Sequence, residues 1–192
     1  MIWWPEEIPV LQAGTITLRP IRPTDAEDVF RGVQDLEIPR FTTVPANYSM
    51  GLAIEFTNSR AKASHANQSE LLFVIEDSRL SNLSEYPYSN GFSGVVSLHT
   101  FDLSNHRAEV GYWITKEARG KRIGTQAVEI ITEYGLLTMG FRRIAGLVDD
   151  LNGASKKLLL NAGYVYEGLL KEYVTRSDGT QRDMAVFAAT RN

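Results

Sequence analysis

A polar turn between an apolar strand and an amphipathic helix constrains this chain more than any other feature. The stretch GYWITKEARGKRIGTQAVEII, residues 111–131, carries two glycines and three basic residues between positions 119 and 124. A helix N-terminus presents unpaired backbone N–H groups and a partial positive charge, and glycine lets a ligand approach the backbone closely. We therefore expect a strand–turn–helix unit at which an anion such as phosphate binds.

The turn matches neither of two common nucleotide-binding motifs. It lacks the phosphate-binding loop Gly-x-x-x-x-Gly-Lys-Ser/Thr and the three-glycine pattern of dinucleotide-binding folds. Its alternative interpretation is a solvated, basic helix start that binds nothing. The residues that could hold an anion here are Arg119, Gly120, Lys121, Arg122 and Gly124.

Strands and helices are expected along the whole chain, which predicts a mixed sheet with helices on its faces. The first helix has Thr24 as its expected N-cap and Glu27 at N3, and Gly140 and Gly163 are expected to end the last two helices. The expected strands are 15–21, 70–77, 92–101, 106–115, 142–149, 166–176 and 182–190, and the expected helices are 22–35, 49–63, 122–139 and 152–162. Residues 78–94 are expected to form a long exposed loop, and the Asp-Gly pair at 178–179 favours a tight hairpin turn.

The composition narrows the possible functions. With 192 residues, 43% of them hydrophobic, the chain is expected to form one domain over residues 1–192. Its net charge of −3 argues against direct nucleic-acid binding. The absence of cysteine excludes thiolate metal sites and cysteine-linked intermediates. No metal is expected, because His65, His99 and His106 lie far apart without ligand spacing.

No membrane contact is expected. No apolar stretch approaches the roughly 20 residues of a membrane span. The N-terminal MIWWPEEIPV has neither the basic segment nor the long apolar run of a secretory signal. We expect a cytoplasmic protein, either a monomer or a homodimer.

Three stretches closely resemble the GNAT acetyltransferases, in particular the RimJ/RimL branch. They are TITLRPIRPTDAEDVF (15–30), AEVGYWITKEARGKRIG (108–124) and VDDLNGASKKLLLNAGYVYEGLLKEYVTRSDGTQRDMAVFA (148–188). The resemblance implies a GNAT fold, with a central mixed twisted sheet of about seven strands flanked by about four helices. It also implies acetyl-CoA-dependent transfer of an acetyl group to a primary amine, such as a protein N-terminus.

In that family the turn holds the pyrophosphate of acetyl-CoA. The family pattern is Gln/Arg-x-x-Gly-x-Gly/Ala, and Arg122 stands where the middle glycine is usual. We expect Arg122 to supply its backbone N–H in ordinary helical geometry, with its side chain displaced. The strand backbone at Trp113 and Ile114 matches the segment that pairs with the pantetheine arm. The cofactor-binding residues implied by the resemblance are Trp113, Ile114, Arg119, Gly120, Lys121, Arg122, Gly124, Thr125 and Asn152.

The resemblance implies that Glu109 is the general base and that Ser155 protonates the leaving thiolate. Strand alternation places Glu109 on the same face as Gly111 and Trp113. The alternatives are a structural Glu109 paired to Arg107 or a neighbouring strand, and an Asn152 N-cap followed by a solvated Ser155. Tyr164 is expected to be the hydrophobic partner of a helix end.

Because there is no cysteine to carry an acetyl group, we expect direct attack in a ternary complex. The expected acceptor is the α-amine of a protein or peptide. The alternatives are a small amine, such as a polyamine, an amino sugar or an aminoacyl nucleotide, and a non-catalytic CoA-binding module. Trp3 and Trp4 are expected to cap the core or a subunit contact, and the tyrosines of EYPYSNGF could line an acceptor groove.

Overall fold

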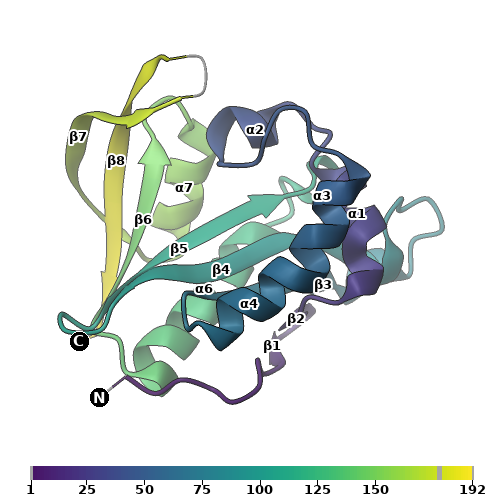
Figure 1. Ribbon diagram of the computed structural model, residues 1–192, viewed down its shortest axis with the longest axis horizontal. Helices are drawn as coiled ribbons and strands as arrows, with labels where there is room; N and C mark the ends of the chain where they lie inside the picture. The colour runs from purple at the N-terminus through teal and green to yellow at the C-terminus, as the bar shows by residue number, and fades with distance from the viewer. Residues whose placement is uncertain (1, 177–178, 192) are drawn as a thin grey trace.

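Eight strands form one mixed sheet in the computed structural model, which describes residues 2–176 and 179–191 (Figure 1). Their order is β1-β2-β3-β4-β5-β6-β8-β7. Neighbouring strands are antiparallel except β5 and β6, which are parallel. The strands are β1 (Leu11–Ala13), β2 (Ile16–Pro20), β3 (Glu70–Asp77), β4 (Phe92–Asp102), β5 (Arg107–Ile114), β6 (Arg143–Asp149), β7 (Val165–Thr175) and β8 (Gln181–Thr190).

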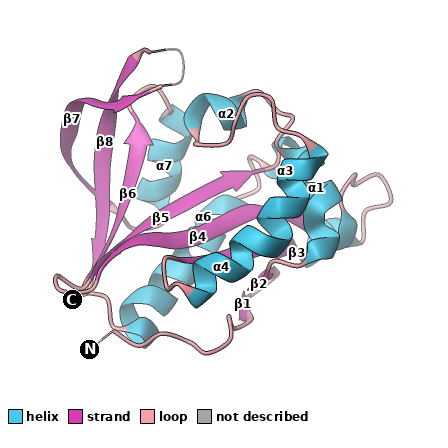
Figure 2. Ribbon diagram, in the orientation of Figure 1, coloured by secondary structure: helices cyan, strands magenta, loops and turns pink. Residues whose placement is uncertain are grey.

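Helices cover both faces of this sheet (Figure 2). The α-helices are α1 (Ala26–Gly32), α2 (Glu37–Phe41), α3 (Met50–Glu55), α4 (Ala61–Ala66), α5 (Ser78–Ser81), α6 (Ile123–Glu133) and α7 (Gly153–Asn161). A π-helical segment, Phe56–Arg60, joins α3 to α4, and another, Tyr134–Met139, extends α6. Short 3-10 turns lie at Pro23–Asp25, Ser89–Gly91 and Lys116–Ala118.

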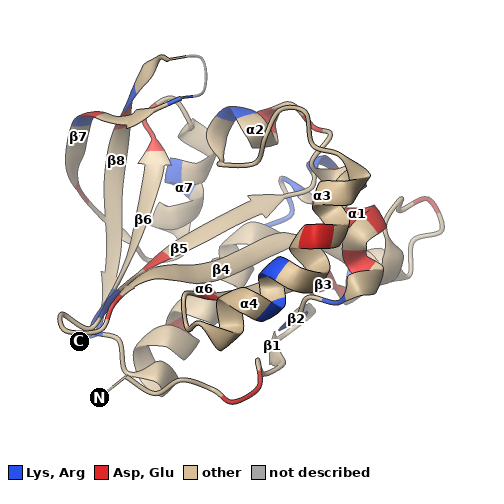
Figure 3. Ribbon diagram, in the orientation of Figure 1, with Lys and Arg blue, Asp and Glu red and all other residues tan. Residues whose placement is uncertain are grey.

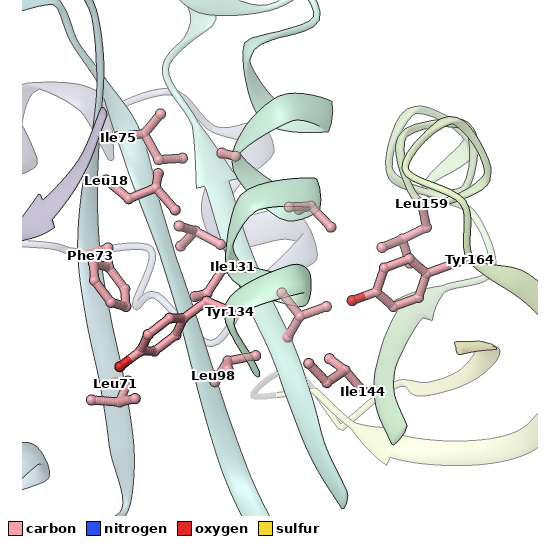
Figure 4. Close-up of a cluster of buried hydrophobic side chains, with 14 of the residues drawn as sticks. Leu18, Leu71, Phe73, Ile75, Leu98, Ile131, Tyr134, Ile144, Leu159 and Tyr164 are labelled. Atoms are coloured by element: carbon pink, nitrogen blue, oxygen red, sulfur yellow. The ribbon is translucent and has the colours of Figure 1, made fainter. Parts of the chain in front are cut away.

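Alternate residues of β3 pack into two separate cores, which is why this strand reads as a continuous apolar run. Leu72 and Val74 join the cluster that contains α1, α3, α4 and Trp113 of β5. Leu71, Phe73 and Ile75 join the cluster on the opposite face, against α6 and α7 (Figure 4). Odd-numbered and even-numbered residues of a strand therefore lie on opposite faces of the sheet, which shows the face to which each side chain points.

The structure confirms the expected mixed sheet and each of its seven expected strands, and β1 brings the count to eight. More helices are present than expected, since α2 and α5 are too short to show a clear period. The second helix begins as expected at Ser49, whose side chain accepts from the backbone N–H of Leu52, and continues through three segments to Ala66.

Two local expectations are wrong. Thr24 is not an N-cap. Asp25 takes that place, where its carboxylate accepts from the backbone N–H of Arg22 at 2.7 Å and pairs with buried Arg19. Residues 78–94 are not simply an exposed loop, because they contain α5 and a 3-10 turn and bury Leu80 and Tyr88. The expected hairpin turn at 178–179 includes residue 178, which lies outside the described residues.

Strands β5 and β6 pair over only three positions before they diverge (Figure 1). The pairs are Arg107 with Arg143, Ala108 with Ile144 and Glu109 with Ala145. Beyond them, in the described chain, the β5 backbone from residue 110 to residue 114 has no strand partner on its β6 side. This open edge, residues 110–114 of β5, lies between the two helical layers.

Candidate active site

The open edge gathers the predicted site residues from two faces of the sheet. On one face of β5, Trp113 packs in the same cluster as α1, and Gly111 lies beneath the ring of His99. Because alternate residues of a strand share a face, Glu109 also lies on the α1 side of the sheet. Tyr112 projects to the opposite face, where it contacts Ser155 of α7. The gap between β5 and β6 is therefore bordered by Glu109 on one side and by Ser155 on the other.

Arg122 does not have the helical geometry that we expected. Its φ is 62° and its ψ is 6°, so it is a left-handed N-cap, and α6 begins one residue later. Its carbonyl accepts from the N–H of Gln126 at 3.0 Å, which starts the helix. Gly120 is also left-handed, with φ of 75°. A residue with a Cβ is strained in this region, which gives a physical reason for a glycine preference at position 122.

The first turn of α6 leaves a group of backbone donors without partners among the described residues. In the described chain, the N–H groups of residues 123–125 have no hydrogen-bond partner. Figure 3 colours the ribbon blue at Lys and Arg, including in the turn that precedes α6. Lys121 donates to the carbonyl of Glu117, whereas the exposed Arg122 side chain makes no ion pair with the described residues. Free donors at a helix N-terminus suit a phosphate oxygen.

Arg119 and Gly124 have structural contacts that the sequence did not predict. Arg119 donates from Nε to the carbonyl of Ile114 at 3.1 Å and pairs with Asp35 at 2.6 Å, so it braces the end of β5 against the segment after α1. A Cβ on Gly124 would lie 2.7 Å from Leu158 Cδ1, so this glycine lets α6 approach α7. Thr125 is buried beside it.

Glu109 is half-buried and makes no hydrogen bond or ion pair with the residues that the structure describes. Arg107, the partner considered in its structural alternative, pairs with Asp102 at 2.9 Å instead. Burial raises the pKa of Glu109 above the ordinary value for a glutamate, and the positive charges of His99 and Arg107 oppose this rise. An unpaired carboxylate with a raised pKa beside an open edge can accept a proton from a ligand.

Ser155 and Asn152 begin α7 as the sequence predicted. Asn152 Oδ1 accepts from the backbone N–H of Ser155 at 3.0 Å, which caps the helix. The Ser155 hydroxyl does not face solvent alone, as the alternative interpretation would have it. Its oxygen lies 2.7 Å from the Tyr112 hydroxyl. Burial raises the pKa of Tyr112, so its phenol stays protonated at neutral pH. The sequence analysis did not identify Tyr112 as a site residue. Its even position in the strand, which puts it on the opposite face of β5 from Glu109, is the signal that could have found it.

The structure also shows where three groups of aromatic residues from the sequence analysis lie. Tyr164 is buried with Leu159, and its hydroxyl lies 2.6 Å from that of Thr132, which confirms its structural role (Figure 4). Trp4 stacks on His65 and meets Phe101 edge-on, so it caps the core. Tyr86 and Tyr88 line pockets with Glu117, beside the basic turn.

The C-terminal end of β6 carries a part-buried ion pair. Asp149 accepts from Arg176 Nη2 at 3.0 Å, and Arg176 Nη1 also donates to the carbonyl of Thr42 at 3.1 Å. These bonds join β6, the end of β7 and the segment after α2. In the described residues, no group of three or more His, Asp or Glu side chains could hold a metal, and no helix could span a membrane.

Comparison with known proteins agrees with this architecture. The acetyltransferase (GNAT) domain family matches residues 15–165. Uncharacterized N-acetyltransferase YoaA of Bacillus subtilis (strain 168) is 27% identical over 180 residues, which cover 94% of this chain and 96% of that protein.

Two solved structures share the fold. One is RimL, the ribosomal L7/L12 alpha-N-protein acetyltransferase in complex with coenzyme A, with a TM-score of 0.80 and 17% identity over 95% of this chain and 98% of that one. The other is the microcin C7 self immunity acetyltransferase MccE in complex with acetyl-CoA and AMP, with a TM-score of 0.78 and 22% identity over 93% of this chain and 94% of that one. Because the family match spans most of the sequence, from β2 to the start of β7, this chain is an acetyltransferase of the GNAT family.

Proposed function

We propose that the protein transfers an acetyl group from acetyl-CoA to a primary amine, most suitably the α-amine of a protein or peptide. The observation that carries this proposal is the open edge of β5, which has unpaired backbone groups, a helix N-terminus at its far end and Glu109 and Ser155 on its two sides. Backbone N–H and C=O groups without partners favour a ligand that can hydrogen-bond to them, and the amides of a pantetheine arm can do so. RimL and MccE were both solved with a CoA ligand.

The cofactor would lie along the open edge and end at the basic turn. Its pyrophosphate would accept from the free N–H groups of residues 123–125, with Lys121 and Arg122 adding positive charge. Arg119 would contribute indirectly, because its guanidinium already holds the carbonyl of Ile114. Trp113 and Ile114 would supply backbone groups, and Asn152 would fix the start of α7 beside the thioester.

The chemistry would proceed by direct attack of the amine on the thioester carbonyl. Glu109 would take the proton that the ammonium loses, either directly or through a water molecule. As the C–S bond breaks, the Ser155 hydroxyl would donate its proton to the thiolate and regain the proton that the attacking nitrogen loses when the amide forms. The Tyr112 phenol, which lies within hydrogen-bond distance, would hold the Ser155 oxygen in place. The absence of cysteine in the chain supports a ternary complex rather than an acetyl-cysteine intermediate.

An α-amine suits this site better than a lysine side chain. An α-amine has a reference pKa of about 8, against about 10.4 for lysine, so a single carboxylate can deprotonate it more readily near neutral pH. The name of RimL, an alpha-N-protein acetyltransferase, supports the same class of acceptor. A small amine such as an aminoacyl nucleotide is the second candidate, supported by AMP in the MccE complex.

The turn supplies a first prediction. Acetyl-CoA should bind about 100-fold more tightly than acetyl-pantetheine, which lacks the pyrophosphate, because charge-assisted hydrogen bonds to residues 123–125 would be lost. Arg122→Gly should keep acetyl-CoA affinity within about tenfold, since the left-handed backbone at 122 persists more easily with glycine. Calorimetry with both ligands checks this, and equal affinities would contradict the proposed pyrophosphate site.

Glu109 supplies a second prediction. Glu109→Gln should lower kcat/KM by about 100-fold near neutral pH, and the defect should shrink at high pH where free amine is abundant. Acetyl-CoA affinity should stay nearly unchanged. Glu129→Gln, at an exposed position of α6, is the matched control and should keep full activity. Full activity of a folded Glu109→Gln variant would return Glu109 to a structural role.

The acceptor class is tested by thiol release from acetyl-CoA in the presence of an amine panel. Short peptides with free N-termini should be acetylated at the α-amine, with internal lysines spared, and N-terminal capping should abolish turnover. Mass spectrometry locates the acetyl group. Reaction only with polyamines, amino sugars or aminoacyl nucleotides would overturn the peptide assignment. If no amine of the panel causes thiol release, the protein is a non-catalytic CoA-binding module.

A further inference from the structure

An imidazole lies between two carboxylates in a row across three strands. In the sheet register, Glu70 of β3 pairs with His99 of β4, and His99 pairs with Glu109 of β5. Val95 of β4 and Trp113 of β5 have the same parity as these residues and pack against α1, so the row faces that helical layer. Directly opposed side chains on neighbouring strands have Cβ atoms about 5 Å apart, so the three groups are near neighbours.

Gly111 makes room for the imidazole ring. A Cβ built on Gly111 would lie 2.7 Å from His99 Nε2 and 3.2 Å from His99 Cδ2. The ring therefore lies over the β5 backbone, one step along the face from Glu109 toward Trp113. Gly111 is not in the left-handed region, so this close approach, rather than backbone conformation, accounts for its glycine.

A bulge in β4 fixes the orientation of the ring. The β4–β5 register shifts after His99, and Thr100 is left-handed with φ of 52°. The Thr100 hydroxyl lies 2.8 Å from His99 Nδ1, whereas Nε2 has no hydrogen-bond partner among the described residues. A strained bulge that re-aims a side chain is a recurrent device beside active sites. Nε2 is thus the free end of the ring, and it lies on the Glu109 face.

We propose that His99 is a positioning residue that acts through Glu109, keeping this carboxylate ionised and relaying the proton that it takes from the amine. This inference rests on the proposed role of Glu109. The ammonium N–H bond breaks and an O–H bond forms on Glu109. The imidazolium form of His99, whose charge favours an ionised Glu109, releases its Nε2 proton to solvent. The freed Nε2 then takes the proton from Glu109, directly or through one water molecule, which restores both the carboxylate and the imidazolium.

The charges around the row are consistent with such a relay. Arg107 on β5 is already paired with Asp102 of β4. On α4, which covers β3, Lys62 is exposed and His65 is engaged with Trp4 and the carbonyl of Pro5. The β6 partner of Glu109 is the uncharged Ala145. Glu70 and Glu109 are therefore the carboxylates that flank His99.

The test is the pH profile of kcat/KM for His99→Gln, with a peptide that bears a free N-terminus as acceptor. Loss of the imidazole removes the positive charge that opposes burial of Glu109, so the acid limb should move to higher pH by about half a unit or more. At pH 7, kcat/KM should fall about tenfold. Acetyl-CoA affinity should not change. His106→Asn, at a turn position outside the site, is the control and should leave the profile unchanged.

Two further variants distinguish a wrong role for His99 from a wrong role for Glu109. Gly111→Ala keeps every titratable group but displaces the ring, and should move the acid limb in the same direction as His99→Gln. Adding His99→Gln to Glu109→Gln should cause no further loss, since the two residues act as one unit. A uniform loss without movement of the acid limb, or additive losses in the double variant, would overturn the relay. Full activity of Glu109→Gln would instead overturn the proposed base, and the relay with it.

Discussion

The divergence of β5 from β6 after three paired positions is the constraint on which the rest of this structure depends. Unpaired backbone groups in a sheet are costly, so a gap persists only when the surrounding contacts hold the two strands apart. Here Arg176 ties the end of β6 to the segment after α2 through Asp149, and Arg119 ties the end of β5 to Asp35. The opening leaves backbone hydrogen-bonding capacity on β5 for a ligand.

The gap also joins two chemically different faces. Glu109 and His99 lie on the α1 side, where burial raises the pKa of the Glu109 carboxyl and favours a proton acceptor. Tyr112 and Ser155 lie on the α7 side, where a protonated phenol supports a hydroxyl that can donate. Acetyl transfer to an ammonium needs a proton removed at the amine and a proton supplied at the leaving sulfur.

Local sequence signals predicted much of the fold because they depend on residues close in the chain. Gly140 and Gly163 end helices in left-handed geometry, and Asn152 caps α7, as their residue types indicated. The apolar runs of β3 and β4 were equally clear. Arg122 was misjudged because a non-glycine residue is rarely left-handed, and its conformation follows from how the turn enters α6.

The remaining site features depend on register between distant strands and helices. The row from Glu70 through His99 to Glu109 arises from pairings across three strands, and the Tyr112–Ser155 contact spans 43 residues of sequence. Gly111 and Gly124 have packing roles that only their neighbours reveal, namely the His99 ring and the Leu158 side chain. No local pattern in the sequence carries this information.

Hydrogen exchange with and without acetyl-CoA tests most directly whether the open edge is the cofactor site. If the open edge is the cofactor site, exchange slows for the β5 amides within residues 110–114 that face the gap and for the first turn of α6, residues 123–125, with little change in β3. Protection confined to other segments, such as the loop at residues 83–88, with residues 110–114 and 123–125 exchanging as in the free protein, would contradict it.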